Sequence, residues 1–210
     1  MGYHGAMKLV ALAVFTAALV FAADTLEFLG RTWSVPVSGD WKVDTSGSAP
    51  VLRLVEHRGP LPGPRRPIQF ALADVPEYGR ITFEADVRPL GASLLIAFAY
   101  RDEAHFDYAH LSVDTGAQQP VHNGIFHVYG GERVRISTDR GPAAFSARGR
   151  WHHVKLIHDA ASGTVDVAVD GHEVPALHAV DVSLGSGKIG PGSFDETGEF
   201  RNVAIATVAR

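Results

Sequence analysis

The sequence predicts an all-β protein, a sandwich of two antiparallel sheets with jelly-roll or Greek-key connections. Apolar and polar residues alternate over several short segments, and this period of two is typical of half-buried strands. The 22 glycines and 12 prolines are spread along the 210 residues, which favours short strands joined by turns. Outside the N-terminal apolar run, no segment has helical three-to-four spacing. We expect roughly 11 to 13 strands from this spacing.

The composition limits the class of protein. Hydrophobic residues make up 46% of the chain, which is enough to bury a core. The formal net charge of -4 argues against a nucleic-acid partner, because such a partner requires a concentrated basic face. The chain contains no cysteine, so disulfides, thiolate metal sites and a lipid-modified cysteine are excluded.

Residues 1–23 have the pattern of a signal peptide. Lys8 precedes an apolar run that ends in small residues, and cleavage after Ala22 or Ala23 fits this pattern. The run is shorter than the roughly 20 residues that span a bilayer, and an uncleaved anchor is the alternative. We therefore predict a secreted or periplasmic protein in which residues 24–210 form a single domain, with no membrane contact after cleavage.

The first strands are expected at Trp41–Val43 and Val51–Val55, separated by a polar turn. The segment His57–Pro67 contains four prolines and three arginines. Proline lacks the amide donor that a central strand requires, so this segment should be a surface loop. Pro67–Leu72 is expected to form a further strand.

Residues 78–114 contain three consecutive predicted strands. Ile81–Arg88 alternates between apolar and polar residues, and Ser93–Tyr100 is apolar on both faces, as expected near the middle of a sheet. His105–Val113 carries aromatic and imidazole groups. We expect these strands to form an antiparallel meander, with the rest of the chain supplying a second sheet to cover its apolar face.

The C-terminal half repeats the same alternation. Asn123-Gly124 and Asp170-Gly171 are strong turn dipeptides. Further strands are expected within or at Ala117–Val128, Glu132–Thr138, Arg150–His158, Thr164–Val169, Gly187–Gly190 and Phe200–Thr207.

The stretch GRWHHVKLIHDAASGTVDVAVDG at Gly149–Gly171 contains a strand led by Trp151, a turn, and a strand ending in Val-Asp-Gly. It resembles laminin-G and concanavalin A-like lectin/glucanase domains, and the segments FEADVRP, AFAYRDEAHFDYAHLSV and EFRNVAIAT fit the same layout. The chain from Trp41 onward is most similar to bacterial exported domains grouped with 3-keto-disaccharide hydrolases. The resemblance implies a jelly roll whose concave face, in many relatives, meets carbohydrate, but one fold hosts many functions.

Glucanases of this superfamily use a Glu-x-Asp-x-Glu run, whose outer glutamates are nucleophile and general acid. Here the corresponding run reads Glu84-Ala85-Asp86-Val87-Arg88. Arginine cannot donate and reclaim a proton at neutral pH, and retaining glycoside hydrolysis needs two carboxyl groups. We therefore expect Glu84 and Asp86 to lie on a solvated face, paired with a neighbouring arginine.

A concentration of aromatic, imidazole and guanidinium groups forms the candidate ligand site. Tyrosine offers a flat ring with a polar tip, while arginine, histidine and asparagine supply directional hydrogen bonds to sugar hydroxyls. If the strand that carries Tyr108 and His110 pairs as a hairpin with the segment that carries His122 and His127, the imidazoles approach one another. Otherwise they are ordinary surface groups. On the first reading, Tyr108→Ala should weaken binding and leave the melting temperature nearly unchanged. The candidates are Arg101, Tyr108, His110, His122, Asn123 and His127.

Ten histidines follow the predicted signal peptide, so a metal site has to be considered. His152 and His153 are adjacent on a predicted strand and face opposite sides, so they cannot chelate one ion together. No compact His-x-His or His-Glu-x-x-His run is present. Asp195-Glu196 is a weak indication of calcium. We expect no cofactor and no metal ligand set, with a structural calcium ion as the alternative.

The sequence thus predicts an exported lectin-like module that recognises a glycan without catalysis. One alternative is a glycoside hydrolase or polysaccharide lyase that uses the same residues, with His110 or His122 as acid or base. In a lyase, the guanidinium groups of Arg58, Arg65 and Arg66 could neutralise a uronic acid carboxylate. The other alternative is a structural module for protein contact.

Overall fold

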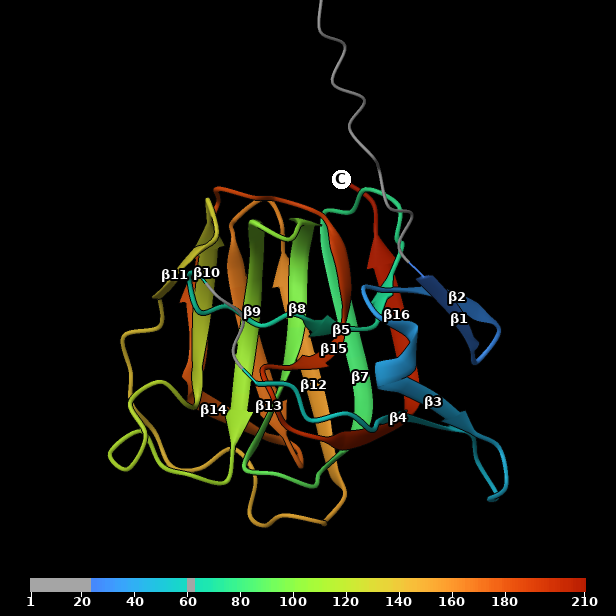
Figure 1. Cartoon of the computed structure of the whole chain (residues 1–210). Coiled ribbons are helices and arrows are strands. Elements are labelled where there is room, and N and C mark those ends of the chain that lie inside the picture. The colour runs from blue at the N-terminus through green and yellow to red at the C-terminus, as the bar shows by residue number, and fades with distance from the viewer. Residues whose placement is uncertain (1–23, 60–62) are drawn as a thin grey trace, which may run out of the picture.

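The computed structural model describes residues 24–59 and 63–210. It contains two antiparallel sheets packed face to face (Figure 1), which confirms the predicted all-β sandwich. The predicted signal peptide lies outside the described residues. No helix in the described part of the chain is long and apolar enough to cross a membrane.

The first sheet has nine strands in the order β1-β2-β6-β15-β8-β9-β10-β11, and β5 also pairs with β15. Its strands are β1 (Asp24–Phe28), β2 (Arg31–Val35), β5 (Gln69–Phe70), β6 (Leu72–Ala73), β8 (Ser93–Asp102), β9 (His105–Ser112), β10 (Gly124–Tyr129), β11 (Glu132–Arg135) and β15 (Lys188–Ser193).

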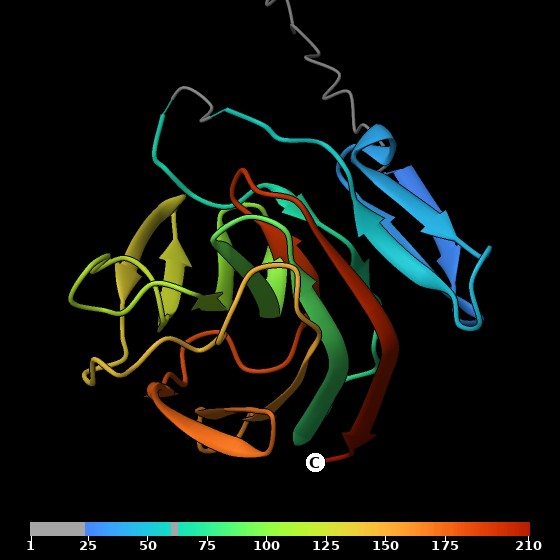
Figure 2. The ribbon, with the colours of Figure 1, turned by 90° about the horizontal axis from the view of Figure 1, so that it is seen from below.

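The second sheet has seven strands in the order β14-β13-β12-β7-β16-β4-β3. Figure 2 shows the N-terminal strands of both sheets gathered at one side of the sandwich, next to the short 3-10 turn η1 (Ser38–Asp40). The strands are β3 (Trp41–Asp44), β4 (Val51–Leu54), β7 (Arg80–Pro89), β12 (His152–Asp159), β13 (Thr164–Val169), β14 (His172–Val180) and β16 (Gly198–Val208).

The sixteen described strands exceed the predicted number. The additional ones are β1, β2 and β14, and one expected strand is divided into β5 and β6. The turn predicted at Asp170-Gly171 is confirmed: it joins β13 to β14 with φ angles of 52° and 81°. Such positive angles are accessible to glycine and are tolerated by aspartate.

The predicted meander is wrong. Strand β7 lies between β12 and β16 in the seven-stranded sheet, whereas β8 and β9 pair in the nine-stranded sheet. The chain therefore crosses from one sheet to the other just after Pro89. An alternating strand buries one face whichever sheet it joins, so the period of two could not distinguish the two arrangements.

Two apolar clusters explain why β8 is apolar on both faces. The main core fills the space between the sheets, with Phe83 and Leu156 from one sheet and Ile96 and Leu111 from the other. The second cluster covers the opposite face of the nine-stranded sheet, which we call the outer face. Its buried members are Phe70, Leu72, Leu95, Ala97, Phe106, Tyr108, Phe126 and Val128.

Candidate functional site

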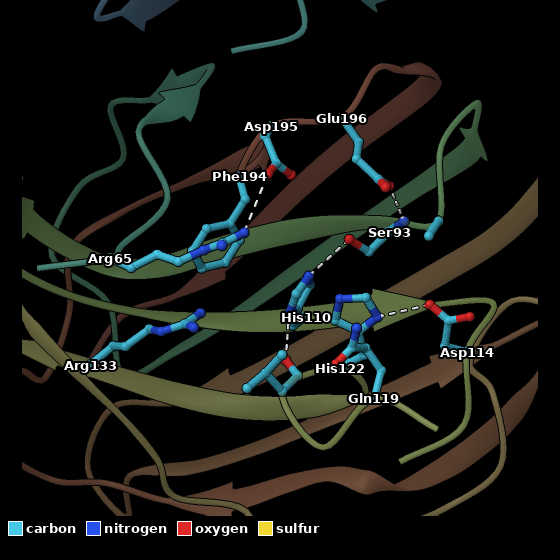
Figure 3. Close-up of a pocket in the computed structure, with 12 residues that line it drawn as sticks. Arg65, Ser93, His110, Asp114, Gln119, His122, Arg133, Phe194, Asp195 and Glu196 are labelled. Atoms are coloured by element: carbon cyan, nitrogen blue, oxygen red, sulfur yellow. Dashed lines mark hydrogen bonds and ion pairs between the residues drawn. The ribbon is translucent and has the colours of Figure 1, made fainter. Parts of the chain in front are cut away.

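A pocket of about 370 Å³ opens on the outer face of the nine-stranded sheet, beside the second apolar cluster (Figure 3). Ser93 of β8 and His110 of β9 line it from the sheet. The loop before β5, the loop between β9 and β10, strand β11 and the turn after β15 contribute the other walls. Segments distant in sequence therefore form one predominantly polar site.

His110 is buried at the sheet side of the pocket and uses both ring nitrogens. Its Nδ1 lies 2.9 Å from the carbonyl oxygen of Val121, which can only accept, so Nδ1 carries the hydrogen. Its Nε2 then accepts a hydrogen bond from the hydroxyl of Ser93 at 3.0 Å. Burial, together with the neighbouring His122, lowers the pKa of His110 to about 3. His110 is therefore a neutral, fully bonded group near neutral pH.

His122 is the more accessible imidazole of the pocket. Its ring centroid lies 4.8 Å from that of His110. Its Nδ1 lies 3.1 Å from a carboxylate oxygen of Asp114 and 3.0 Å from the hydroxyl of Ser112. Its Nε2 has no hydrogen-bond partner among the described residues. The Asp114–His122 pair thus orients an imidazole that has one nitrogen left for a ligand.

Two guanidinium groups face the pocket beside Phe194. Arg65 pairs with Asp195 at 3.2 Å, and its Cζ lies 5.7 Å from the centre of the Phe194 ring. The Cζ of Arg133 lies 4.8 Å from the same ring centre. No carboxylate in residues 24–59 and 63–210 lies within ion-pair distance of Arg133. The positive charge of Arg133 is therefore available to an anionic group in the pocket.

Glu196 ties the turn after β15 to the start of β8. Its carboxylate accepts a hydrogen bond from the backbone N–H of Ser93, and its own backbone N–H donates to the hydroxyl of Ser193, at the end of β15, at 2.9 Å. The two acidic residues predicted as a weak calcium indication, Asp195 and Glu196, are thus engaged with Arg65 and Ser93 respectively.

Tyr108 does not form the exposed platform that the sequence predicts. Its side chain is 0% exposed and lies in the second apolar cluster, stacked on Phe126 with ring centroids 5.1 Å apart. Its hydroxyl accepts a hydrogen bond from Arg133 at 3.4 Å, and Phe194 packs edge-on against its ring. Alternation correctly places Tyr108 on the face of His110, but it cannot reveal that other segments cover that face.

Asn123 is also buried and acts within the fold. Its φ angle of 52° lies in the left-handed region, which agrees with the predicted turn. Its side-chain oxygen accepts hydrogen bonds from the N–H groups of Ser112 and Ala144 at 2.9 and 3.1 Å. Its side-chain N–H donates to the carbonyl of Asp114. Asn123 therefore holds the loop that carries the Asp114–His122 pair.

Arg101 and His127 lie away from the pocket. Strand β8 begins at Ser93, and Arg101 lies near its other end. There it donates a hydrogen bond to the carbonyl of Leu184 at 2.9 Å. His127 points to the inner face of β10, where it meets Asp107 and not His110. Of the six candidate residues, the pocket lining brings together His110 and His122.

The arginine-rich loop is only partly available for ligand binding. Arg58 forms a two-pronged ion pair with the buried Asp40, with contacts of 2.6 and 2.7 Å. Arg66 donates to the backbone carbonyl of Glu103 at 2.8 Å. Arg65 alone of these three arginines lines the pocket.

The carboxylates Glu84 and Asp86 lie on the solvated face of the seven-stranded sheet, on the opposite side of the molecule from the pocket. Glu84 pairs with Lys155 at 2.7 Å, and Asp86 pairs with Arg201 at 3.3 Å. The expectation of a solvated, ion-paired face is therefore confirmed.

Several lining residues are absent from the sequence-based candidates. The alternation of Glu132–Thr138 places Arg133 on the polar face of the predicted strand, but it cannot show that this side chain lines a pocket. The sequence around Phe194 contains no pattern that predicts a pocket residue, because the position of Phe194 depends on the pairing of β15 with β8. The other additional lining residues include Ser93, Asp114, Gln119, Asp195 and Glu196.

A scan against protein-family models finds no match, and a search of the curated proteins finds none. Among solved structures, the chain is similar to the carbohydrate binding module CBM66 from Bacillus subtilis, with a TM-score of 0.60 and 18% identity, covering 83% of this chain and 95% of that one. A Bacillus subtilis protein of unknown function with a galectin-like fold matches with a TM-score of 0.51 and 16% identity, covering 81% and 88%. The chain therefore shares the fold of these structures, a concanavalin A-like two-sheet β-sandwich.

The concanavalin A-like fold also occurs in larger proteins. The chain is similar to part of xylan β-1,4-xylosidase from Bacillus halodurans C-125, with a TM-score of 0.53 and 10% identity. The match covers 90% of this chain and 40% of that protein. The predicted resemblance is thus confirmed for the fold, while identities this low carry no information about activity.

Proposed function

We propose that this chain binds a glycan in the pocket between His110, His122 and Arg133, without cleaving it. The supporting observation is a polar pocket that lies beside an aromatic cluster. The pocket has a volume of about 370 Å³, which lies within the range of roughly 300–1,000 Å³ found for small-molecule sites. The free Nε2 of His122 and the guanidinium of Arg133 suit the directional hydrogen bonding of sugar hydroxyls. Similarity in fold to a carbohydrate binding module adds support.

Arg133 favours an acidic sugar. A guanidinium group without a carboxylate partner pairs with a planar carboxylate through two parallel hydrogen bonds. The bound glycan would therefore contain a uronic acid, with its carboxylate facing Arg133. Export, predicted from the apolar run before Asp24, would bring the pocket to glycans outside the cytoplasm.

The Asp114–His122 pair favours a polysaccharide lyase as the second candidate. In this reaction a base removes the proton next to the uronate carboxylate, a carbon–carbon double bond forms, and the bond from the adjacent carbon to the glycosidic oxygen breaks. The leaving oxygen takes up a proton from water and departs as a hydroxyl group. His122 would take the proton at Nε2, and Arg133 would stabilise the negative charge on the carboxylate. His110 is unsuited to this role because both of its nitrogens are occupied.

Binding is tested with a panel of neutral and uronate-containing oligosaccharides, followed by calorimetry on any hit. Arg133→Gln should weaken binding by about tenfold or more, because a charge-assisted hydrogen bond is lost. Arg101→Gln is the matched control: it removes a guanidinium at the opposite end of β8 and should leave affinity unchanged. Melting temperatures of both variants verify that the fold is retained.

Three outcomes would contradict glycan binding without cleavage. Equal affinity of the Arg133→Gln variant and the unmodified chain, or no binding across the panel, would remove the pocket as the site. Appearance of unsaturated uronate ends, absorbing in the ultraviolet and lost in His122→Gln, would instead identify the lyase.

A further inference from the structure

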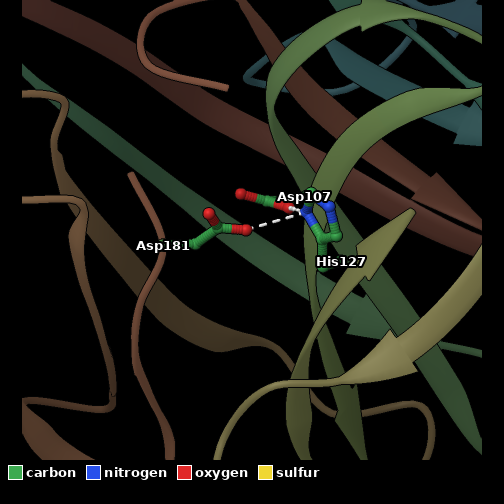
Figure 4. A group of neighbouring side chains, drawn as sticks. All are labelled: Asp107, His127 and Asp181. Carbon is green, nitrogen blue, oxygen red and sulfur yellow. Dashed lines mark hydrogen bonds and ion pairs between the residues drawn. The ribbon is translucent and has the colours of Figure 1, made fainter. Parts of the chain in front are cut away.

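Three side chains with metal-ligating atoms converge on the inner face of the nine-stranded sheet (Figure 4). Asp107 of β9 and His127 of β10 are directly opposite each other in the strand pairing. Asp181 comes from the segment that follows β14 in the other sheet. One ligand atom from each residue lies within 4.8 Å of the other two. The cluster thus bridges the two layers and is separate from the glycan pocket.

The contacts around His127 place two carboxylates on one nitrogen. Its Nδ1 lies 2.7 Å from an oxygen of Asp107 and 2.8 Å from an oxygen of Asp181. A single N–H group makes only one well-directed hydrogen bond. A proton on Nδ1 can therefore form a well-directed hydrogen bond with one of the two carboxylates and leaves the other without one. The second oxygen of Asp107 has no hydrogen-bond partner among the described residues.

The cluster also lacks positive charge. Asp107 is 1% exposed, and no lysine or arginine of the described chain pairs with Asp107 or Asp181. Two carboxylates and one imidazolium carry a net charge of -1, and a neutral imidazole leaves -2. Burying such an excess is costly unless a cation compensates it.

We propose that Asp107, His127 and Asp181 bind a zinc ion. Zinc accepts a mixed set of imidazole nitrogen and carboxylate oxygen, whereas calcium and magnesium prefer oxygen alone. Three protein ligands leave the fourth tetrahedral position for water, and the side chains of His127 and Asp181 are 14% and 15% exposed, which gives the ion a path to the site.

Coordination requires only a small adjustment. Zinc–ligand bonds of about 2.0–2.2 Å separate tetrahedral ligands by about 3.3–3.6 Å, so the two contacts of His127 would each lengthen by about 0.5–0.9 Å. Asp181 lies just after the end of β14, and its backbone N–H donates to the carbonyl of Gly163 at 2.9 Å. The movement would therefore come from its partly exposed side chain. Because its ligands come from both layers, the bound ion would link the sheets and stabilise the folded chain by mass action.

The test uses the full chain, first freed of metal with a chelator and then titrated with zinc chloride by calorimetry. We expect one strong site per chain and a higher melting temperature with zinc. Asp181→Asn and His127→Gln should each weaken this site by at least tenfold. His178→Gln is the matched control, because His178 makes the same 2.7 Å contact with Asp166 on the exposed surface; its zinc affinity should be unchanged.

Equal zinc affinity in His127→Gln, Asp181→Asn and His178→Gln would overturn the assignment, because it would place the ion on other surface groups. An unchanged melting temperature at saturating zinc, or a rise with calcium alone, would also overturn it. If His127→Gln fails to fold, the near-isosteric Asp181→Asn decides the outcome, since Asp181 is partly exposed.

Discussion

At the scale of the residue, Tyr108 supports the pocket from below. Its buried ring stacks on Phe126 and its hydroxyl accepts from Arg133, the residue proposed to meet the ligand. The ring therefore contributes to the stability of the outer face, and the hydroxyl helps to orient one guanidinium. Neither role requires contact with a ligand.

Tyr108→Ala should lower the free energy of unfolding by about 3–5 kcal/mol, because truncation of a buried aromatic ring leaves a cavity. Chemical denaturation measures this loss. Tyr108→Phe is the control: it keeps the ring and removes one long hydrogen bond, so its cost should stay below about 1.5 kcal/mol. A Tyr108→Ala variant as stable as the unmodified chain would mean that the ring is exposed after all.

At the scale of the element, the loop between β9 and β10 depends on Arg135 of β11. Its guanidinium donates to backbone carbonyls of this loop, including that of His122 at 3.3 Å, and to carbonyls of the segment that follows β11. Gly124 leaves room for this group, since a Cβ atom there would collide with it. The complete set of accepting carbonyls belongs to Pro120, His122, Asn123, Ser137 and Asp139.

Arg135→Lys should loosen this loop, because an ammonium group cannot reproduce the planar, five-donor geometry. We expect a stability loss of about 1–3 kcal/mol, faster amide exchange over residues 115–123 and weaker glycan binding. Hydrogen-exchange mass spectrometry measures the local effect. Arg140→Lys, at an exposed arginine, is the control; equal exchange in both variants would show that Arg135 does not position the loop.

The strands and the functional side chains differ in how far the sequence could predict them. Alternation located most strands correctly, because burial of one face acts within a single strand. It could not assign β7 to its sheet or place His127 on the inner face of β10, since both depend on which strands pair. His110 and His122 were found because aromatic and imidazole residues concentrate there, whereas Arg65, Arg133 and Phe194 meet only through long-range packing.

At the scale of the whole molecule, two buried histidines make the fold sensitive to acid. His158 lies inside the sandwich with its Nδ1 3.2 Å from the hydroxyl of Tyr78, and burial lowers its pKa to about 4, opposed by Asp159 and Asp181. The pKa of His110 is lowered to about 3. In the unfolded chain both should titrate near pH 6.5.

Stability should therefore fall as the pH drops below about 6.5, because the unfolded chain then binds protons that the folded chain does not. The contribution of His158 is lost progressively down to its folded pKa of about 4. Urea unfolding between pH 7.5 and 4, in the presence of a chelator, measures the slope. His158→Phe should flatten it and the exposed His172→Phe should not; parallel profiles would exclude His158 as the cause.

Strand β11 lies at the free edge of the nine-stranded sheet and carries the sequence Glu-Arg-Val-Arg. Unpaired edges recruit strands from other molecules, and charged side chains are a common defence against such aggregation. Arg133 and Arg135 thus place positive charge on this edge as well as shaping the pocket, while Val134 between them is 56% exposed. Variants that neutralise these arginines should be checked by light scattering for self-association before any lost affinity is assigned to the missing charge.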